Sequence, residues 1–190
     1  MMTDIEIRDY YASLLADHGA THRAGDHGSV ASMARRHHVL REGVRWASPY
    51  FGTVLDVGCG IGTMARGLHG RYTGWDIVPT LIEVARATYP TSRFEVRDLL
   101  DSRACDAFDF VWASGLFQFR DPHYLREAVA RMFALSRHGV AFNWLTRADG
   151  TPGETAHDPL VVLAFGRTLT TRVVLRTDYQ DNDASLYLFK

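Results

Sequence analysis

The segment VLDVGCGIGT, residues 54–63, constrains the fold of this chain most, because an apolar, strand-like run leads directly into three glycines spaced two apart. Gly58, Gly60 and Gly62 stand where a strand would turn into a helix, and a backbone without side chains there can approach a ligand closely. A dinucleotide fingerprint, G-x-G-x-x-G, would need its third glycine at Thr63. The spacing therefore predicts a nucleoside site and argues against nicotinamide or flavin dinucleotides.

Strand-like and helix-like segments alternate along the chain. The predicted strands are residues 53–57, 72–77, 93–98, 109–114, 140–145, 172–179 and 184–190, and the predicted helices are residues 3–19, 29–47, 63–68, 79–89, 122–135 and 159–169. Alternation of this kind favours a parallel sheet with helices on both faces. The last two strands are joined by a link too short for a helical crossover, which predicts a hairpin. We expect an α/β, Rossmann-like three-layer sandwich with a seven-stranded, mostly parallel sheet and an antiparallel C-terminal hairpin.

Length and charge narrow the class of protein. The 190 residues fit a single domain, which we expect to consist of a helical lid over residues 1–50 and a cofactor-binding core over residues 51–190. Twenty-one Lys and Arg against 22 Asp and Glu give a net charge of −1, so no strong field recruits nucleic acid or an anionic membrane. Two cysteines make no disulfide or zinc framework, and no signal segment opens the chain. These features predict a cytoplasmic protein without nucleic-acid or membrane partners.

The pattern Asp56-x-Gly58-x-Gly60-x-Gly62 resembles the nucleotide-binding motif of class I S-adenosylmethionine-dependent methyltransferases. Proteins of that family have a seven-stranded sheet that ends in an antiparallel hairpin, which matches the element order deduced above. The resemblance covers roughly residues 54–190 and is strongest over residues 54–116. It implies S-adenosyl-L-methionine as the cofactor.

The resemblance also implies roles for residues at the ends of the second and third strands. Asp76 would accept hydrogen bonds from the ribose hydroxyls, with Ile77 beside it. Asp98 would accept from the adenine amino group, and the backbone amide of Leu99 would contact the ring.

A further set of residues would hold the methionine portion of the cofactor. In the resembling family, residues at the positions of Ser114 and Gly115 face the methionine and the reacting methyl group. Asp56 would order the glycine turn and help to hold the amino group. Arg36 is a candidate for the carboxylate, because a guanidinium fork suits that group, and its alternative is a solvated helix position.

The sulfonium of the cofactor already activates the methyl group, so the protein mainly has to align the acceptor with it. If the acceptor is a hydroxyl or a protonated amine, a base is also needed to remove its proton. His123 and the pair Asp178 and Tyr179 are the candidate catalytic residues. Their alternatives are a surface histidine on a helix and, for the pair, turn formation and edge packing. His157 borders an irregular loop, and Asn143 points either into the core or toward the site.

Motifs that the chain lacks narrow the range of possible methyl acceptors. The fourth strand is followed by ASGLFQF rather than by the Asn- or Asp-Pro-Pro-aromatic motif of enzymes that methylate amino groups of nucleic-acid bases or glutamine. Ser114 and Asn143 replace much of the ligand set of metal-dependent enzymes, so no metal is expected. We expect methyl transfer to an O or N atom of a small molecule, such as a secondary metabolite or sugar. The alternatives are a noncatalytic binding protein and an enzyme using the cofactor for another reaction; a homodimer is also left open.

Overall fold

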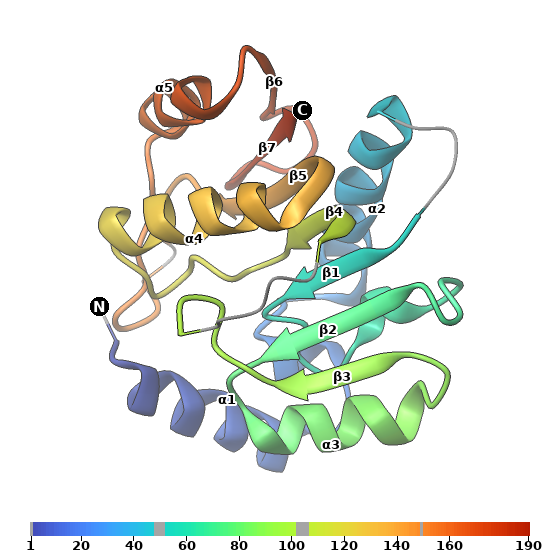
Figure 1. The fold of residues 1–190 in the computed structure, drawn as a ribbon. Coiled ribbons are helices and arrows are strands. Elements are labelled where there is room, and N and C mark those ends of the chain that lie inside the picture. Colours follow the sequence, from blue (N-terminus) through green and yellow to red (C-terminus); the bar gives the residue numbers. More distant parts are fainter. Residues whose placement is uncertain (1, 48–51, 102–106, 149) are drawn as a thin grey trace.

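The computed structural model describes residues 2–47, 52–101, 107–148 and 150–190. Its centre is one sheet in the order β3-β2-β1-β4-β5-β7-β6 (Figure 1). The strands are β1 (Val54–Val57), β2 (Tyr72–Asp76), β3 (Arg93–Val96), β4 (Phe108–Ala113), β5 (Ser136–Leu145), β6 (Arg172–Arg176) and β7 (Asp183–Phe189). Strands β1 to β5 pair in parallel, whereas β7 is antiparallel to both β5 and β6. The predicted fold class, including its antiparallel end, is confirmed.

Helices cover both faces of this sheet. They are α1 (Asp4–His18), α2 (Val30–Ala47), α3 (Pro79–Thr88), α4 (Pro122–Leu135) and α5 (Pro159–Leu169), with the short 3-10 helices η1 (His22–Gly25) and η2 (Thr63–Ala65). Apolar residues of α4 and α5 share one buried cluster, and those of α2 and α3 share another. Strand β4 joins the clusters, since Val111 faces the first and Trp112 the second, as alternation along a strand requires. No helix of the described ranges is long and apolar enough to cross a bilayer.

Side chains that precede the helices explain where they begin. Thr3 and Glu6 form a capping box at α1, with the Thr3 amide 2.7 Å from Oε2 of Glu6. Asp121 accepts the amide of Tyr124 at 2.6 Å at the start of α4, and Asp158 caps α5 in the same way.

The helix predicted over residues 63–68 is wrong, since the structure has only the single turn η2 there. Gly62 before the turn and Gly67 just after it both have positive φ, 77° and 81°. Arg66 between them has an extended ψ of 121°. An α-helix cannot continue through such angles, so the chain leaves the turn early. An open groove lies between this turn and α2.

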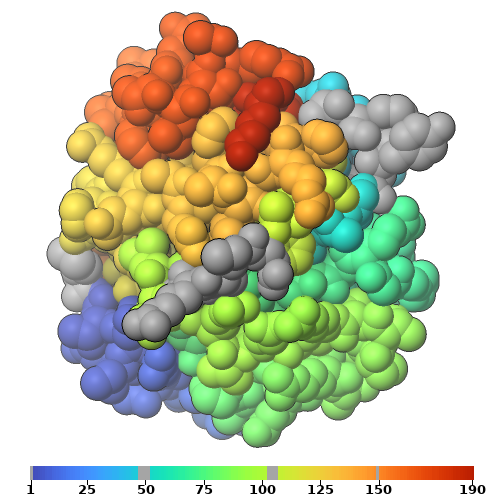
Figure 2. Space-filling view, viewed as in Figure 1, coloured from blue at the N-terminus to red at the C-terminus, as the bar shows by residue number. Residues whose placement is uncertain are grey.

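The segment predicted as a lid divides into two parts. Helix α2 lies on the sheet, with Val39, Leu40 and Val44 in the core. The α1 and η1 part instead packs beside α3 and the chain after β4, as the blue N-terminal region of Figure 2 shows. Asp4 of α1 forms an ion pair of 2.6 Å with Arg120. This part closes the edge of the sheet where β1, β2 and β4 end.

Candidate functional site

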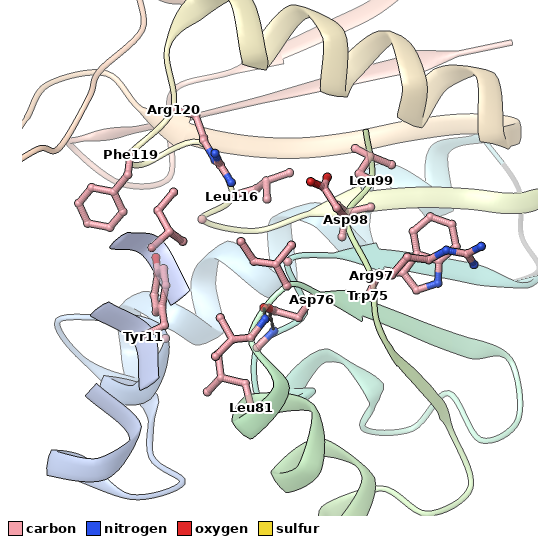
Figure 3. A pocket seen from close by; sticks show the side chains of 18 of the residues that line it. Tyr11, Trp75, Asp76, Leu81, Arg97, Asp98, Leu99, Leu116, Phe119 and Arg120 are labelled. Atoms are coloured by element: carbon pink, nitrogen blue, oxygen red, sulfur yellow. Dashed lines mark hydrogen bonds between the residues drawn. The ribbon is translucent and has the colours of Figure 1, made fainter. Parts of the chain in front are cut away.

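A cavity opens where β1, β2 and β4 reach their carboxyl ends. In open α/β sheets this edge is where ligands bind. Figure 3 shows Asp76, Asp98 and Leu99 on the sheet side of the cavity and Tyr11 and Phe119 on the side of α1. The residues predicted for the cofactor that line this cavity are Gly58, Gly60, Asp76, Ile77, Asp98, Leu99 and Gly115. The structure thus brings most of the predicted cofactor set together.

Asp76 is held rigidly at the end of β2. Its Oδ2 accepts the amide of Gly60 at 2.8 Å, and its Oδ1 accepts the amide of Val78 at 2.9 Å. Burial raises the pKa of Asp76, and the backbone hydrogen bonds oppose that rise. Because each carboxylate oxygen has a second lone pair, the side chain can still accept two hydroxyl groups from the cavity.

The three glycines of the turn are required for different reasons. All have positive φ, 71° at Gly58, 54° at Gly60 and 77° at Gly62. A methyl group on Gly62 would lie 2.7 Å from Cε1 of Phe94, so this glycine makes room for the protein itself. A methyl group on Gly60 would meet no atom within 4 Å. Gly60 therefore leaves its space to the cavity, where a ligand can contact the backbone.

The loop after β3 supplies the next wall. Oδ1 of Asp98 accepts the amide of Leu100 at 2.8 Å, while Leu99 is buried. Arg97, in the same loop, lies with its guanidinium 4.5 Å from the ring centre of Trp75. A carboxylate and an apolar side chain here face the cavity next to Asp76, which suits an aromatic base with an amino group.

A second cavity adjoins the first and shares Tyr11, Gly25, Gly60 and Gly115 with it. Asp56 and Ser114 line it, as predicted for the methionine end. Asp56 accepts the hydroxyl of the buried Tyr72, and burial raises the pKa of Asp56 to about 7 despite this hydrogen bond. A cationic ligand group beside Asp56 would favour its ionised form.

Three histidines of the second cavity, His22, His27 and His37, were missed by the sequence analysis. The sequence does carry one signal that could have pointed to them, since residues 18–38 contain five histidines. Periodicity does not show which of these face a cavity. Within the described ranges, no three His, Cys, Asp or Glu side chains come close enough together to hold a metal ion.

Asn143 points toward the site from β5, which answers the question that strand alternation left open. It is 1% exposed, and its Oδ1 accepts the amide of Gly115 at 2.9 Å. Its Nδ2 lies 3.3 Å from Oγ of Ser114. Asn143 therefore positions the loop that separates the two cavities.

An Asn143→Ala variant should lower the free energy of unfolding by about 1–3 kcal/mol, because the amide of Gly115 loses its buried partner. Urea unfolding measures this change. Asn182→Ala is the matched control, since the buried Oδ1 of Asn182 has no hydrogen-bond partner among the described residues. Equal stability losses in the two variants would contradict the role given to Asn143.

Arg36 lies behind His27 and does not line either cavity. Its Nε pairs with the buried Asp183, and its Nη1 lies 3.3 Å from Nδ1 of His27. A guanidinium only donates, so Nδ1 of His27 accepts and the neutral ring carries its proton on Nε2. Burial, followed by Arg36, lowers the pKa of His27 to about 3. Contact between Arg36 and a cofactor carboxylate remains a prediction.

His27 should make the free energy of unfolding depend on pH. Its pKa in the folded protein is about 3, whereas the ordinary value is 6.5, so between these values the unfolded chain binds a proton that the folded chain does not. The contribution of neutral His27 is complete above about pH 6.5 and is lost as pH falls toward 3. A His27→Asn variant, which keeps an acceptor for Arg36, should lose less stability between about pH 7 and 5 than the wild type. An unchanged slope in urea unfolding would contradict this.

The predicted catalytic residues lie away from both cavities. His123 has a side chain 79% exposed on α4, 3.5 Å from Glu127, because Pro122 begins the helix and turns the next residue to solvent. Asp178 is 67% exposed and pairs with Arg176 at 2.5 Å. Tyr179 is buried, with its hydroxyl 2.8 Å from Oγ of Ser185. The structure gives these three the roles of surface, turn and packing residues.

His157, a candidate from the sequence, and Tyr11 are placed differently. His157 is buried beside α4 and α5, where its carbonyl accepts the indole of Trp144 at 2.9 Å, and it lines neither cavity. Tyr11 of α1 lines both cavities. Of the two, only Tyr11 can contact a ligand there.

Comparisons with known proteins agree with this geometry. A family model described as a methyltransferase domain matches residues 54–139, whereas a search of curated protein sequences gives no match. Magnesium protoporphyrin IX methyltransferase from Synechocystis PCC 6803 with bound SAH has a TM-score of 0.74 at 15% identity, covering 98% of this chain and 99% of that chain. N-methyltransferase NodS from Bradyrhizobium japonicum WM9 in complex with S-adenosyl-L-homocysteine has a TM-score of 0.70 at 16% identity, covering 96% and 97%.

A third solved structure, the DhpI-SAM-HEP complex, has a TM-score of 0.69 at 17% identity, covering 94% of each chain. At these identities the likeness shows the fold. The domain match covers the strands and turns that line the first cavity. Residues 54–139 thus match a methyltransferase domain model, and the chain shares the Rossmann-like fold of these three solved structures, as its glycine motif predicts.

Proposed function

We propose that this protein transfers the methyl group of S-adenosyl-L-methionine to an O or N atom of a small organic molecule. The observation that carries the proposal is the pairing of Asp76 with Gly60, where a fixed carboxylate borders the open space over a side-chain-free turn. The names of two structural neighbours, a magnesium protoporphyrin IX methyltransferase and an N-methyltransferase, support transfer to an acceptor of this kind.

The residues of the two cavities fit the parts of this cofactor. Asp76 would accept the ribose hydroxyls, and Asp98 with Leu99 would hold the adenine. Asp56 and the loop at Ser114 would hold the methionine end in the second cavity. The cofactor supplies a methyl group already activated by the sulfonium. The chain then has to orient the acceptor, exclude water and receive a proton.

The test is incubation of the protein with S-adenosyl-L-methionine carrying a deuterated methyl group and a panel of small hydroxyl and amine compounds. Mass spectrometry should find the labelled methyl group on an O or N atom of a product, together with an equal amount of S-adenosyl-L-homocysteine. Binding of the cofactor without labelled product across a broad panel would favour a noncatalytic protein. Label in another position would indicate a different reaction.

A further inference from the structure

An open groove lies between α2 and the short turn η2, outside the second cavity. Met33, His37 and Thr63 line both the groove and the second cavity, so these three side chains form the wall between them. The groove lies beside η2, which ends after one turn where a helix was expected. Met33, His37 and Thr63 thus face the groove on one side and the second cavity on the other.

The groove is basic. Of its lining residues, the titratable ones in the described part of the chain are His37, His38, Arg41, Arg66 and Tyr89, with no Asp or Glu. Nη2 of Arg41 donates to the carbonyl of Met64 at 2.5 Å and to that of Arg66 at 3.0 Å, and Asp56, which favours the charged form of Arg41, does not line the groove.

The buried Nε of Arg41 has no hydrogen-bond partner among the described residues. Val30, 60% exposed, adds an apolar surface beside the two arginines. This combination suits an organic anion with an apolar part.

His37 is the residue of the shared wall that can accept a proton. Its ring lies 5.9 Å from that of His27, at an interplanar angle of 87°. Burial, followed by Arg41 and Arg36, lowers the pKa of His37 to about 4, so the ring is neutral near pH 7 and one nitrogen keeps a lone pair. His27 cannot do the same, because its Nδ1 already accepts from Arg36.

We propose that the methyl acceptor is a small carboxylate-bearing molecule that lies in the α2 groove and loses its proton to His37. This inference rests on the proposed function. The acceptor's O or N lone pair forms the new bond to the methyl carbon, while the carbon–sulfur bond breaks and its electron pair stays on sulfur. The acceptor's proton moves to a ring nitrogen of His37, which becomes imidazolium and later releases the proton to water. The guanidinium of Arg66, beside that of Arg41, holds the carboxylate.

The charged surroundings of His37 come from three parts of the chain. Arg36 and Arg41 lie on α2 itself, His22 and His27 on the preceding segment, and Asp56 and Cys59 at the end of β1. In wild type the methylation rate should therefore be flat from about pH 6 to 9, because His37 stays neutral throughout. In His37→Ala the rate should rise with pH over this range, because the acceptor must then lose its proton to water.

The experiment uses hydroxy- and amino-substituted benzoates and short aliphatic carboxylates, each paired with its neutral primary amide. The carboxylates should be methylated at least about tenfold faster than their amides. His37→Asn should lower kcat about 100-fold without changing the affinity for S-adenosyl-L-homocysteine, and free imidazole should partly rescue His37→Ala. Arg66→Glu should raise KM about tenfold.

A control variant away from the groove, Arg167→Glu on α5, should keep the wild-type kcat and KM. Equal methylation of amides and carboxylates, or methylation of neither series, would overturn the inference, as would a His37→Asn enzyme with wild-type turnover. Calorimetry with S-adenosyl-L-homocysteine separates these outcomes from failure of the proposed function. If the proposed function were wrong, the wild-type protein would not bind S-adenosyl-L-homocysteine at all.

Discussion

A Gly60→Val variant is expected to bind S-adenosyl-L-homocysteine about 100-fold more weakly than the wild type, because the valine side chain would occupy the space that the turn leaves to the ligand. Gly60 has no atom within 4 Å of the position its Cβ would take, and it lines both cavities. Calorimetric titration measures the loss.

Backbone strain has to be separated from this effect, because valine is unfavourable at the φ of 54° that Gly60 adopts. Gly70→Val is the matched control. Gly70 has a φ of 67°, nothing within 4 Å of an added Cβ, and no place in the cavity walls. Both variants should lose stability through strain, of about 1–2 kcal/mol or more, but Gly70→Val should keep its affinity. Equal affinities in the two variants would contradict the assignment of the turn.

An Asp76→Ala variant should weaken binding of S-adenosyl-L-homocysteine by about 10- to 150-fold, the equivalent of about 1.5–3 kcal/mol for lost charged hydrogen bonds. The substitution removes the carboxylate that would accept the ribose hydroxyls. It also leaves the amides of Gly60 and Val78 without their acceptor, so the variant should unfold at a lower temperature. Calorimetry and thermal unfolding measure the two effects.

Asp178→Ala is the control for this substitution, since Asp178 lies on the exposed turn before β7 and pairs with Arg176. It should bind the sulfur nucleoside as tightly as the wild type. An Asp76→Asn variant should fold better than Asp76→Ala, because an amide oxygen can accept one of the two backbone amides. Wild-type affinity in Asp76→Ala would show that the ribose lies elsewhere.

The fold and the meeting of the predicted cofactor residues at one edge of the sheet could be predicted from the sequence because their signals are local. Strand ends, glycines and the acidic residues Asp76 and Asp98 follow one another in a fixed order, and parallel strands bring such ends to one edge. The antiparallel end of the sheet followed from the short link between its last two strands. These features need no knowledge of contacts between distant segments.

The acceptor half could not be predicted because it depends on such contacts. His27 faces the second cavity only because Arg36, held by Asp183 from β7, fixes its ring. His123, by contrast, has the residue type of a base but a helix position that faces solvent. The groove could not be predicted from the sequence either, since residues 63–68 have a helix-like pattern. Only the structure shows the positive φ angles of Gly62 and Gly67, which end the turn.

The central claim is that the turn at Gly58 to Gly62 and the carboxylate of Asp76 bind a sulfur nucleoside. Calorimetric titration of the wild-type protein with S-adenosyl-L-methionine and S-adenosyl-L-homocysteine, with a nicotinamide dinucleotide in parallel, tests it most directly. We predict one site for either sulfur nucleoside and no heat of binding for the dinucleotide. Binding of the dinucleotide, or of neither sulfur nucleoside, would contradict the account.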